Sequence, residues 1–133
     1  MNIDEQFWQV DDWHEYAQSE QTVDAAVEIM LEEVQELRDA KEADDLVEIA
    51  DALGDILVTV YGVIRAVHLD AAEYNLPIDD IFSEIMDSNF SKFVLGADGQ
   101  HAALFREDGK ILKGPNYFRP NLAKVLGAEL DNE

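Results

Sequence analysis

Two long stretches of helical apolar periodicity, separated by a few residues, constrain the fold of this chain more than any other feature. In the first, residues 22–40, apolar side chains recur every three or four positions, which is typical of an amphipathic helix. The second, residues 45–69, repeats the pattern and is apolar nearly all round in its later half. We therefore predict two long helices, the second of them buried in its later half, within the chain or against another subunit.

The short segment 41–45 decides whether these stretches form one helix or two. An unbroken helix, rising about 1.5 Å per residue, would hold Glu36 and Glu48 roughly 18 Å apart. No Gly or Pro marks a break. Asp45 is nevertheless a favourable N-cap, and Glu48, three residues later, can complete a capping box. We therefore predict that the chain reverses here and forms an antiparallel helical hairpin.

Such a hairpin brings two acidic motifs into one groove. The motifs are an EExxE on the first helix and an ExxD on the second, formed by Glu32, Glu33, Glu36, Glu48 and Asp51. A turn centred near residue 42 places Glu36 opposite Glu48, and Glu33 opposite Asp51. Oxygen ligands without Cys or His favour a hard cation such as Mg²⁺, for which Mn²⁺ can substitute. The spacing predicts these five carboxylates as metal ligands, although a solvated acidic helix face would have the same spacing.

The rest of the chain completes a helical fold. We predict an N-terminal helix over 3–18, another from Pro77 to about residue 89, and beyond Lys92 a series of turns with one small hairpin and a helix over 121–126. The prediction is an all-α helical bundle, its four-helix core completed by oligomerisation, with a short irregular or hairpin C-terminal tail. We expect one domain, 1–133, with a helical core of about 3–92 and a substrate-side tail of about 93–133.

Composition excludes several classes of function. The chain has 30 acidic and 9 basic residues and a net charge of -21, and no basic stretch offers nucleic-acid phosphates a counter-charge. The absence of Cys excludes disulfides and thiolate metal sites. The longest apolar run, 56–67, is interrupted and too short to span a bilayer, so we expect a soluble, cytoplasmic protein. The acidity alone also fits adaptation to salt, or a non-enzymatic module that imitates the charge of DNA.

The motifs together carry a family resemblance. EExxE followed by ExxD resembles the all-alpha nucleoside triphosphate pyrophosphatases, which include MazG-like enzymes, dimeric dUTPases and phosphoribosyl-ATP pyrophosphohydrolase. The stretch EIADALGD, residues 48–55, is similar to the phosphoribosyl-ATP-pyrophosphohydrolase-like branch that contains MazG-like dUTP-cleaving proteins. SNFSK at 88–92, DGK at 108–110 and KGPNY at 113–117 resemble the substrate-side elements of that branch, and Trp13-His14 resembles its N-terminal aromatic-His pair.

The resemblance implies a reaction and roles for particular residues. It implies Mg²⁺-dependent cleavage of a nucleoside triphosphate such as dUTP into the monophosphate and pyrophosphate, by a homodimer or homotetramer. The five motif carboxylates would bind metal, Glu33 would also orient or deprotonate the attacking water, and Asp55 would support the ligands from outside. His14 is interpreted as a packed residue outside the site. The expected substrate-binding residues are Asn89, Lys92, Lys113, Asn116 and Tyr117. An enzyme for phosphoribosyl-ATP is the alternative within the family.

Overall fold

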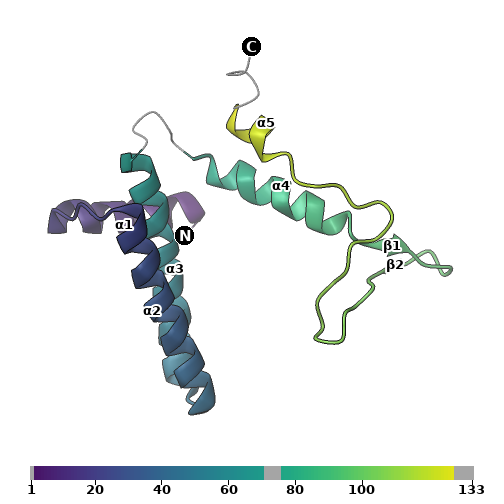
Figure 1. The fold of residues 1–133 in the computed structure, drawn as a ribbon, viewed down its shortest axis with the longest axis horizontal. Coiled ribbons are helices and arrows are strands. Elements are labelled where there is room, and N and C mark those ends of the chain that lie inside the picture. The colour runs from purple at the N-terminus through teal and green to yellow at the C-terminus, as the bar shows by residue number, and fades with distance from the viewer. Residues whose placement is uncertain (1, 71–75, 128–133) are drawn as a thin grey trace. The chain divides into compact units, whose positions relative to one another are not determined.

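The computed structural model describes residues 2–70 and 76–127, which belong to two compact units, Met1–Leu76 and Pro77–Glu133 (Figure 1). The first unit contains α1 (Ile3–Ala17), α2 (Val23–Glu42) and α3 (Leu46–Asp70). The second contains α4 (Ile78–Phe90), β1 (Val94–Leu95), β2 (His101–Ala102) and α5 (Leu122–Leu126). The predicted all-α fold is confirmed, with one two-stranded ladder added to the helices. No helix among the described residues is both long and apolar enough to cross a membrane.

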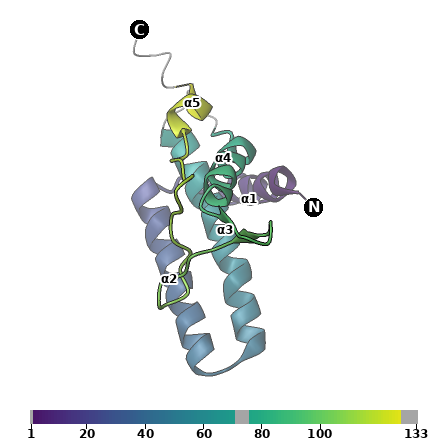
Figure 2. The same cartoon turned by 90° about the vertical axis from the view of Figure 1, so that its right-hand side faces the viewer.

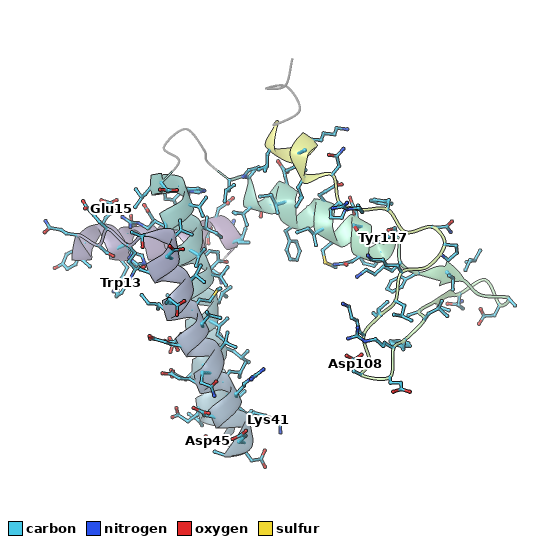
Figure 3. The ribbon with its side chains drawn as sticks, in the orientation of Figure 1. Trp13, Glu15, Lys41, Asp45, Asp108 and Tyr117 are labelled. Carbon is cyan, nitrogen blue, oxygen red and sulfur yellow. The ribbon has the colours of Figure 1, made fainter. Side chains whose placement is uncertain are left out.

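The α2–α3 pair forms the predicted antiparallel hairpin, with the two helices side by side (Figure 2). Asp44 closes the turn with a left-handed backbone, at φ 53°, a conformation that Asp tolerates better than most residues. Asp45 donates its backbone N–H to the Ala40 carbonyl, and its side chain accepts from the Glu48 N–H at 3.2 Å. Figure 3 shows Lys41 and Asp45 at this end of the hairpin. The chain therefore reverses without Gly or Pro, and Asp45 caps α3 as predicted.

Helix α1 is anchored to α3 by polar contacts. The Tyr61 hydroxyl donates to Gln6 Oε1 at 2.7 Å. Arg65, whose side chain is only 6% exposed, donates to three oxygens on or just after α1, at 3.0–3.1 Å: those of Asp11, Glu15 and Ser19. These bonds fix the position of α1 against the first unit's hairpin.

Burial in the later half of α3 is confined to one side. Tyr61 and Ala66 are buried, but Leu57 and Val58 are each 45% exposed and Val60 is 36% exposed. The prediction that this half is buried is therefore wrong for the single chain, because α1 and α2 cover only part of its apolar circumference. Burial of the remainder against another subunit stays a prediction.

The second unit contains two successive hairpins where the sequence predicted one. In the first, β1 pairs antiparallel with β2. In the second, Phe105 bridges Ile111, and the Arg106 N–H donates to the Lys110 carbonyl at 2.8 Å. Gly109 provides the left-handed turn residue at φ 88°. The Asp-Gly turn signal at 108–109 thus marks a real hairpin whose ladder is too short to form a regular strand pair.

The segment after the hairpins returns along α4. The Gly114 N–H donates to the Lys92 carbonyl at 3.1 Å, and the Ser88 hydroxyl donates to the Phe118 carbonyl at 2.7 Å. A Cβ at Gly114 would lie 2.4 Å from the Lys92 oxygen, so this close approach requires glycine. Because the C-terminal segment is bonded to α4, the compact unit begins at Pro77, earlier than the predicted change from core to tail near residue 92. The single domain stays a prediction.

Candidate active site

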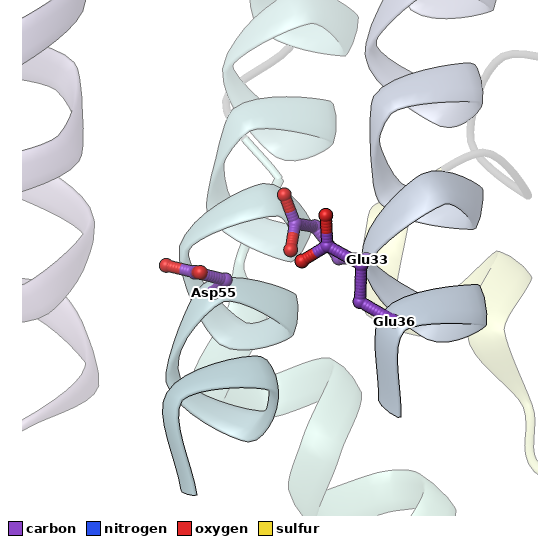
Figure 4. A group of neighbouring side chains, drawn as sticks. All are labelled: Glu33, Glu36 and Asp55. Atoms are coloured by element: carbon purple, nitrogen blue, oxygen red, sulfur yellow. The ribbon is translucent and has the colours of Figure 1, made fainter. Parts of the chain in front are cut away.

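Three carboxylates from the α2–α3 hairpin converge in the first unit. Glu33 and Glu36 project from α2 and Asp55 from α3, and one oxygen of each lies within 4.8 Å of the others (Figure 4). Glu33 and Asp55 are half-buried and Glu36 is exposed. Within residues 2–70 and 76–127, no other group of three acidic or histidine side chains lies close enough together to hold a metal ion. We refer to Glu33, Glu36 and Asp55 as the carboxylate trio.

The position of the turn explains why Asp55 belongs to the trio. The helix α2 ends at Glu42 and α3 begins at Leu46, so the reversal is centred at residue 44, two residues later than the predicted centre. Moving the centre by two residues moves each facing position by about four, which is one helical turn. Asp55 therefore lies where Asp51 was expected, opposite Glu33.

Mutual repulsion and burial perturb the ionisation of Glu33. Burial raises the pKa of this carboxyl, and the hydrogen bond with Glu36 and the negative charges of Glu36, Asp55 and Asp51 raise it further. Glu33 Oε2 is buried and has no hydrogen-bond partner in the described part of the chain. A buried carboxylate oxygen without a donor, beside two more carboxylates, matches the all-oxygen site that a hard divalent cation prefers.

The other predicted ligands lie on the same two helices. Glu32, Glu48 and Asp51 are exposed and lie outside the trio. Asp51 is near enough for its charge to act on Glu33. Their role as ligands remains a prediction.

A cavity of about 270 Å³ opens beside the trio. Glu33 and Asp55 form part of its wall, so two of the three carboxylates face the same space. The remaining wall comes from α1, α2, α3 and the segment between α1 and α2, through Trp13, His14, Gln21, Ala26, Ile29, Val58, Thr59 and Gly62. The site therefore combines a carboxylate cluster with a pocket that offers both apolar and hydrogen-bonding groups.

His14 lines this cavity and has one ring nitrogen that is buried without a hydrogen-bond partner in the described residues. The residue is only 5% exposed, and its Nδ1 has no hydrogen-bond partner within the described residues. Gly62 lies beside the ring, where a Cβ would be in ordinary van der Waals contact with His14 Nε2, at 3.5 Å. Burial lowers the pKa of His14, and the charge of Arg65 lowers it further, against a smaller opposite effect of Asp11. Both effects favour the neutral imidazole, in which one nitrogen can donate a hydrogen bond and the other can accept one.

The sequence interpretation of His14 was incomplete. The residue is packed as predicted, yet it also lines the cavity. The only signal for this was the Trp13-His14 pair itself, because the contacts with α2 and α3 are distant in sequence.

The expected substrate-binding residues gather at a second, larger cavity, which lies within the second unit. This open cavity of about 560 Å³ includes four of them in its wall: Asn89, Lys92, Lys113 and Tyr117. Lys113 Nζ lies 4.9 Å from the centre of the Tyr117 ring, in cation–π contact. Asn116 is exposed and outside the wall. Arg106 and Lys110, from the second hairpin, also line this cavity. From the sequence, Lys110 was placed in a substrate-side motif without a binding role, and Arg106 was missed.

Comparison with known proteins identifies the family. The model of the family described as phosphoribosyl-ATP pyrophosphohydrolase matches residues 10–89, which include the whole trio, His14 and Asn89. No match was found among curated proteins or among solved structures. Enzymes of this family depend on a divalent metal, and the carboxylate trio fits that requirement. The chain therefore belongs to the phosphoribosyl-ATP pyrophosphohydrolase family of the all-alpha NTP pyrophosphatase superfamily, and is a hydrolase of phosphoric anhydride bonds.

Proposed function

We propose that this enzyme is a Mg²⁺-dependent nucleoside triphosphate pyrophosphohydrolase that converts a deoxynucleotide such as dUTP into its monophosphate and pyrophosphate. The observation that carries the proposal is the carboxylate trio, two members of which, Glu33 and Asp55, line a cavity large enough for one nucleobase. Mn²⁺ is the expected substitute for Mg²⁺.

The hairpin carboxylates divide between two tasks in this proposal. Glu36 and Asp55 would hold the metal, and Glu32, Glu48 and Asp51 would complete its shell directly or through water. The metal, when bound, neutralises phosphate charge and orients the attacking water. Glu33 would both help to hold the metal and receive a proton from that water.

Glu33 is suited to the role of base. The influences that raise its pKa move it from the range of an ordinary carboxyl toward the operating pH, where a general base is most effective. The water oxygen forms a bond to the α phosphorus, and the bond from that phosphorus to the bridging oxygen breaks. The electron pair leaves with pyrophosphate, and the proton passes to Glu33.

The 270 Å³ cavity is the proposed site of the base. The neutral His14 ring can donate at one nitrogen and accept at the other, and Gln21 and Thr59 add further hydrogen-bonding groups. Trp13 gives the same wall an aromatic face. A site built this way would reject a phosphorylated compound that lacks a nucleobase.

Phosphoribosyl-ATP is an equally supported substrate at the level of the family. It also carries a base and a triphosphate, so the same trio and cavity would serve it. The non-enzymatic acidic module is disfavoured, because the chain belongs to a family of hydrolases. The substrate panel described below separates the remaining two.

Assembly into a homodimer or homotetramer is part of the proposal. Large apolar side chains lie exposed along α2 and α3, among them Leu31, Leu53 and Leu57 at 45–53% exposure. Their burial against a second hairpin would complete a four-helix core. Sedimentation analysis of the wild type would show a dimer or tetramer, and a monomer at high concentration would contradict this part.

The test of the proposed function is pyrophosphate release from a panel of substrates. The panel contains dUTP, dCTP, dTTP, the ribonucleotides and phosphoribosyl-ATP, each with Mg²⁺, Mn²⁺ or chelator. We expect metal-dependent release that Glu33→Gln lowers by two orders of magnitude or more. Glu28→Gln, an exposed change on the same helix with equal change of charge, should leave the rate unaltered. Release from phosphoribosyl-ATP alone would replace the proposed substrate, and equal rates for both variants would refute the role of Glu33.

A further inference from the structure

The cavity of the second unit gathers positive charge in a strongly acidic protein. Only 9 of the 133 residues are basic, yet four of these nine line this one cavity: Lys92, Arg106, Lys110 and Lys113. Among the described residues that form its wall, none is Asp or Glu. Arg106 is paired with Asp108, but the three lysines have no carboxylate partner among the described residues, so the cavity keeps positive charge that a bound anion would balance.

The backbone brings these four cations together from distant parts of the chain. The hydrogen bond from the Gly114 N–H to the Lys92 carbonyl, at 3.1 Å, holds the residue after Lys113 against the end of α4. The second hairpin pairs Arg106 directly with Lys110, through the 2.8 Å backbone bond that precedes its turn. Lys92 and Lys113 therefore lie on one hydrogen-bonded part of the backbone, and Arg106 and Lys110 lie on another, within the same compact unit.

Asp108 orients the Arg106 guanidinium. Arg106 Nε donates to Asp108 Oδ1 at 2.9 Å, and Nη2 donates to the other carboxylate oxygen. This pairing raises the pKa of Arg106 and lowers that of Asp108. Among the described residues Arg106 Nη1 has no hydrogen-bond partner, so its N–H groups remain available to an oxygen anion.

We propose that this cavity binds a linear phosphate chain, with Arg106 and Lys110 as phosphate-binding residues beside Lys92 and Lys113. That the bound phosphate chain is the triphosphate of the substrate rests on the proposed function. That the cavity binds a phosphate chain at all does not depend on the proposed function. Several cations at a single open cavity suit a ligand with charges distributed along its length, and Arg with Lys is a common combination for phosphate oxygens. Asn89 and Tyr117 add polar groups to the same wall.

The competing interpretation is that Arg106 only stabilises the hairpin, through its ion pair with Asp108, and that Lys110 is a solvated surface residue. It predicts that neutralising either residue changes hairpin stability at most, and leaves anion affinity unaffected. The two interpretations therefore differ in a binding measurement.

The experiment is calorimetric titration of the full chain with pyrophosphate and with tripolyphosphate, in chelator and at low ionic strength. It uses the wild type and, separately, Glu33→Gln, so that hydrolysis and bound metal do not contribute. We expect Arg106→Gln and Lys110→Gln each to weaken binding about fivefold or more, because each removes a charge-assisted hydrogen bond at an exposed site. Lys124→Gln makes the same charge change on α5, outside the cavity wall, and should alter the affinity less than twofold. Circular dichroism and thermal melting confirm that each variant is folded.

The outcomes separate this inference from the proposed function. Equal affinities for the three Lys and Arg variants, or no binding of either anion by the wild type, would overturn the inference even if the enzyme hydrolyses dUTP. Selective weakening by Arg106→Gln and Lys110→Gln would support it even if no nucleotide were hydrolysed. If a nucleoside triphosphate displaces tripolyphosphate, the cavity binds the phosphate chain of the substrate. If pyrophosphate displaces tripolyphosphate and the nucleotide does not, the cavity binds the product.

Discussion

Replacement of Arg65 by Met should detach α1 from the α2–α3 hairpin. The Arg65 side chain is 6% exposed and makes the three hydrogen bonds that hold α1 and the residue Ser19 against α3. Met retains an unbranched stem of similar length, so the change removes the charge and the donors while keeping much of the packing. The perturbation therefore tests the polar anchor rather than the volume of the side chain.

The expected loss of stability is about 3–5 kcal/mol. The bond to Asp11, whose side chain is 23% exposed, should contribute about 1.5–3 kcal/mol, and the bond to the Ser19 carbonyl about 1.5 kcal/mol. Glu15 is 67% exposed, so solvent screening limits its contribution to about 1 kcal/mol or less. The sum agrees with the cost of breaking a buried ion pair from one side, about 3–5 kcal/mol.

Urea unfolding at fixed protein concentration measures this loss, since any oligomer would make the midpoint depend on concentration. Arg38→Met is the matched control, because Arg38 is exposed on α2 and should change the unfolding free energy by less than about 0.5 kcal/mol. A double-mutant cycle with Asp11→Asn should show a coupling of about 1.5–3 kcal/mol.

The same variant has a consequence for activity. Because α1 carries Trp13 and His14 into the cavity, Arg65→Met should raise the KM for the nucleotide. A loss of stability under about 1 kcal/mol, or unchanged KM in a variant shown to be destabilised, would refute the reasoning that Arg65 positions α1.

Three further predictions follow from the structure. Gly114→Ala should destabilise the protein by about 1–3 kcal/mol, because its Cβ would lie 2.4 Å from a backbone oxygen. Gly54→Ala is the matched control: its Cβ would meet no atom within 4 Å, and the change should stabilise the protein by up to about 1 kcal/mol. Thermal melting curves of the two variants measure both effects. Burial lowers the pKa values of His14 and His68, so the folded protein should lose stability as the pH drops below their ordinary value of 6.5, because the unfolded chain then takes up more protons. His14→Gln should reduce the slope of unfolding free energy against pH in this range, and an unchanged slope would contradict the prediction. The pKa of Glu33 is raised above 4.5, so without metal Glu33 should retain its proton at a pH where ordinary carboxyls have lost theirs. Binding of Mg²⁺ should release that proton in the same pH range. Calorimetry in buffers of different ionisation heat detects the proton release, and Glu33→Gln should abolish the release.

The helices could be predicted from the sequence because their information is local. The apolar periodicity of α2 and α3 and the capping residues Thr22 and Asp45 lie within or next to the elements that they define. The reversal itself was predictable only in part. Asp44 adopts a left-handed conformation that Gly or Asn usually provides, so the exact turn residue gave no clear signal.

The two-residue error in the turn had a large effect on the site. It moved the expected partner of Glu33 by one helical turn, from Asp51 to Asp55. The motif spacing alone could not resolve this, because Asp51 and Asp55 are four residues apart and lie on the same helix face.

The remaining cavity residues depend on contacts that are distant in sequence. His14 reaches the cavity because Arg65 holds α1 against α3, and nothing local to residue 14 encodes that contact. Likewise, Arg106 and Lys110 meet Lys92 through a hairpin whose Asp-Gly turn was visible in the sequence, but whose packing was not. Tertiary packing therefore decides which of the polar residues share a site.

The most direct test of the central claim is the position of the metal. Anomalous diffraction from crystals grown with Mn²⁺ and a non-hydrolysable dUTP analogue would locate the ion. The account predicts a peak coordinated by oxygens of Glu36 and Asp55, with Glu33 in contact with it or with a bound water. A peak that touches none of the carboxylate trio, in crystals of an enzyme active with Mn²⁺, would contradict it.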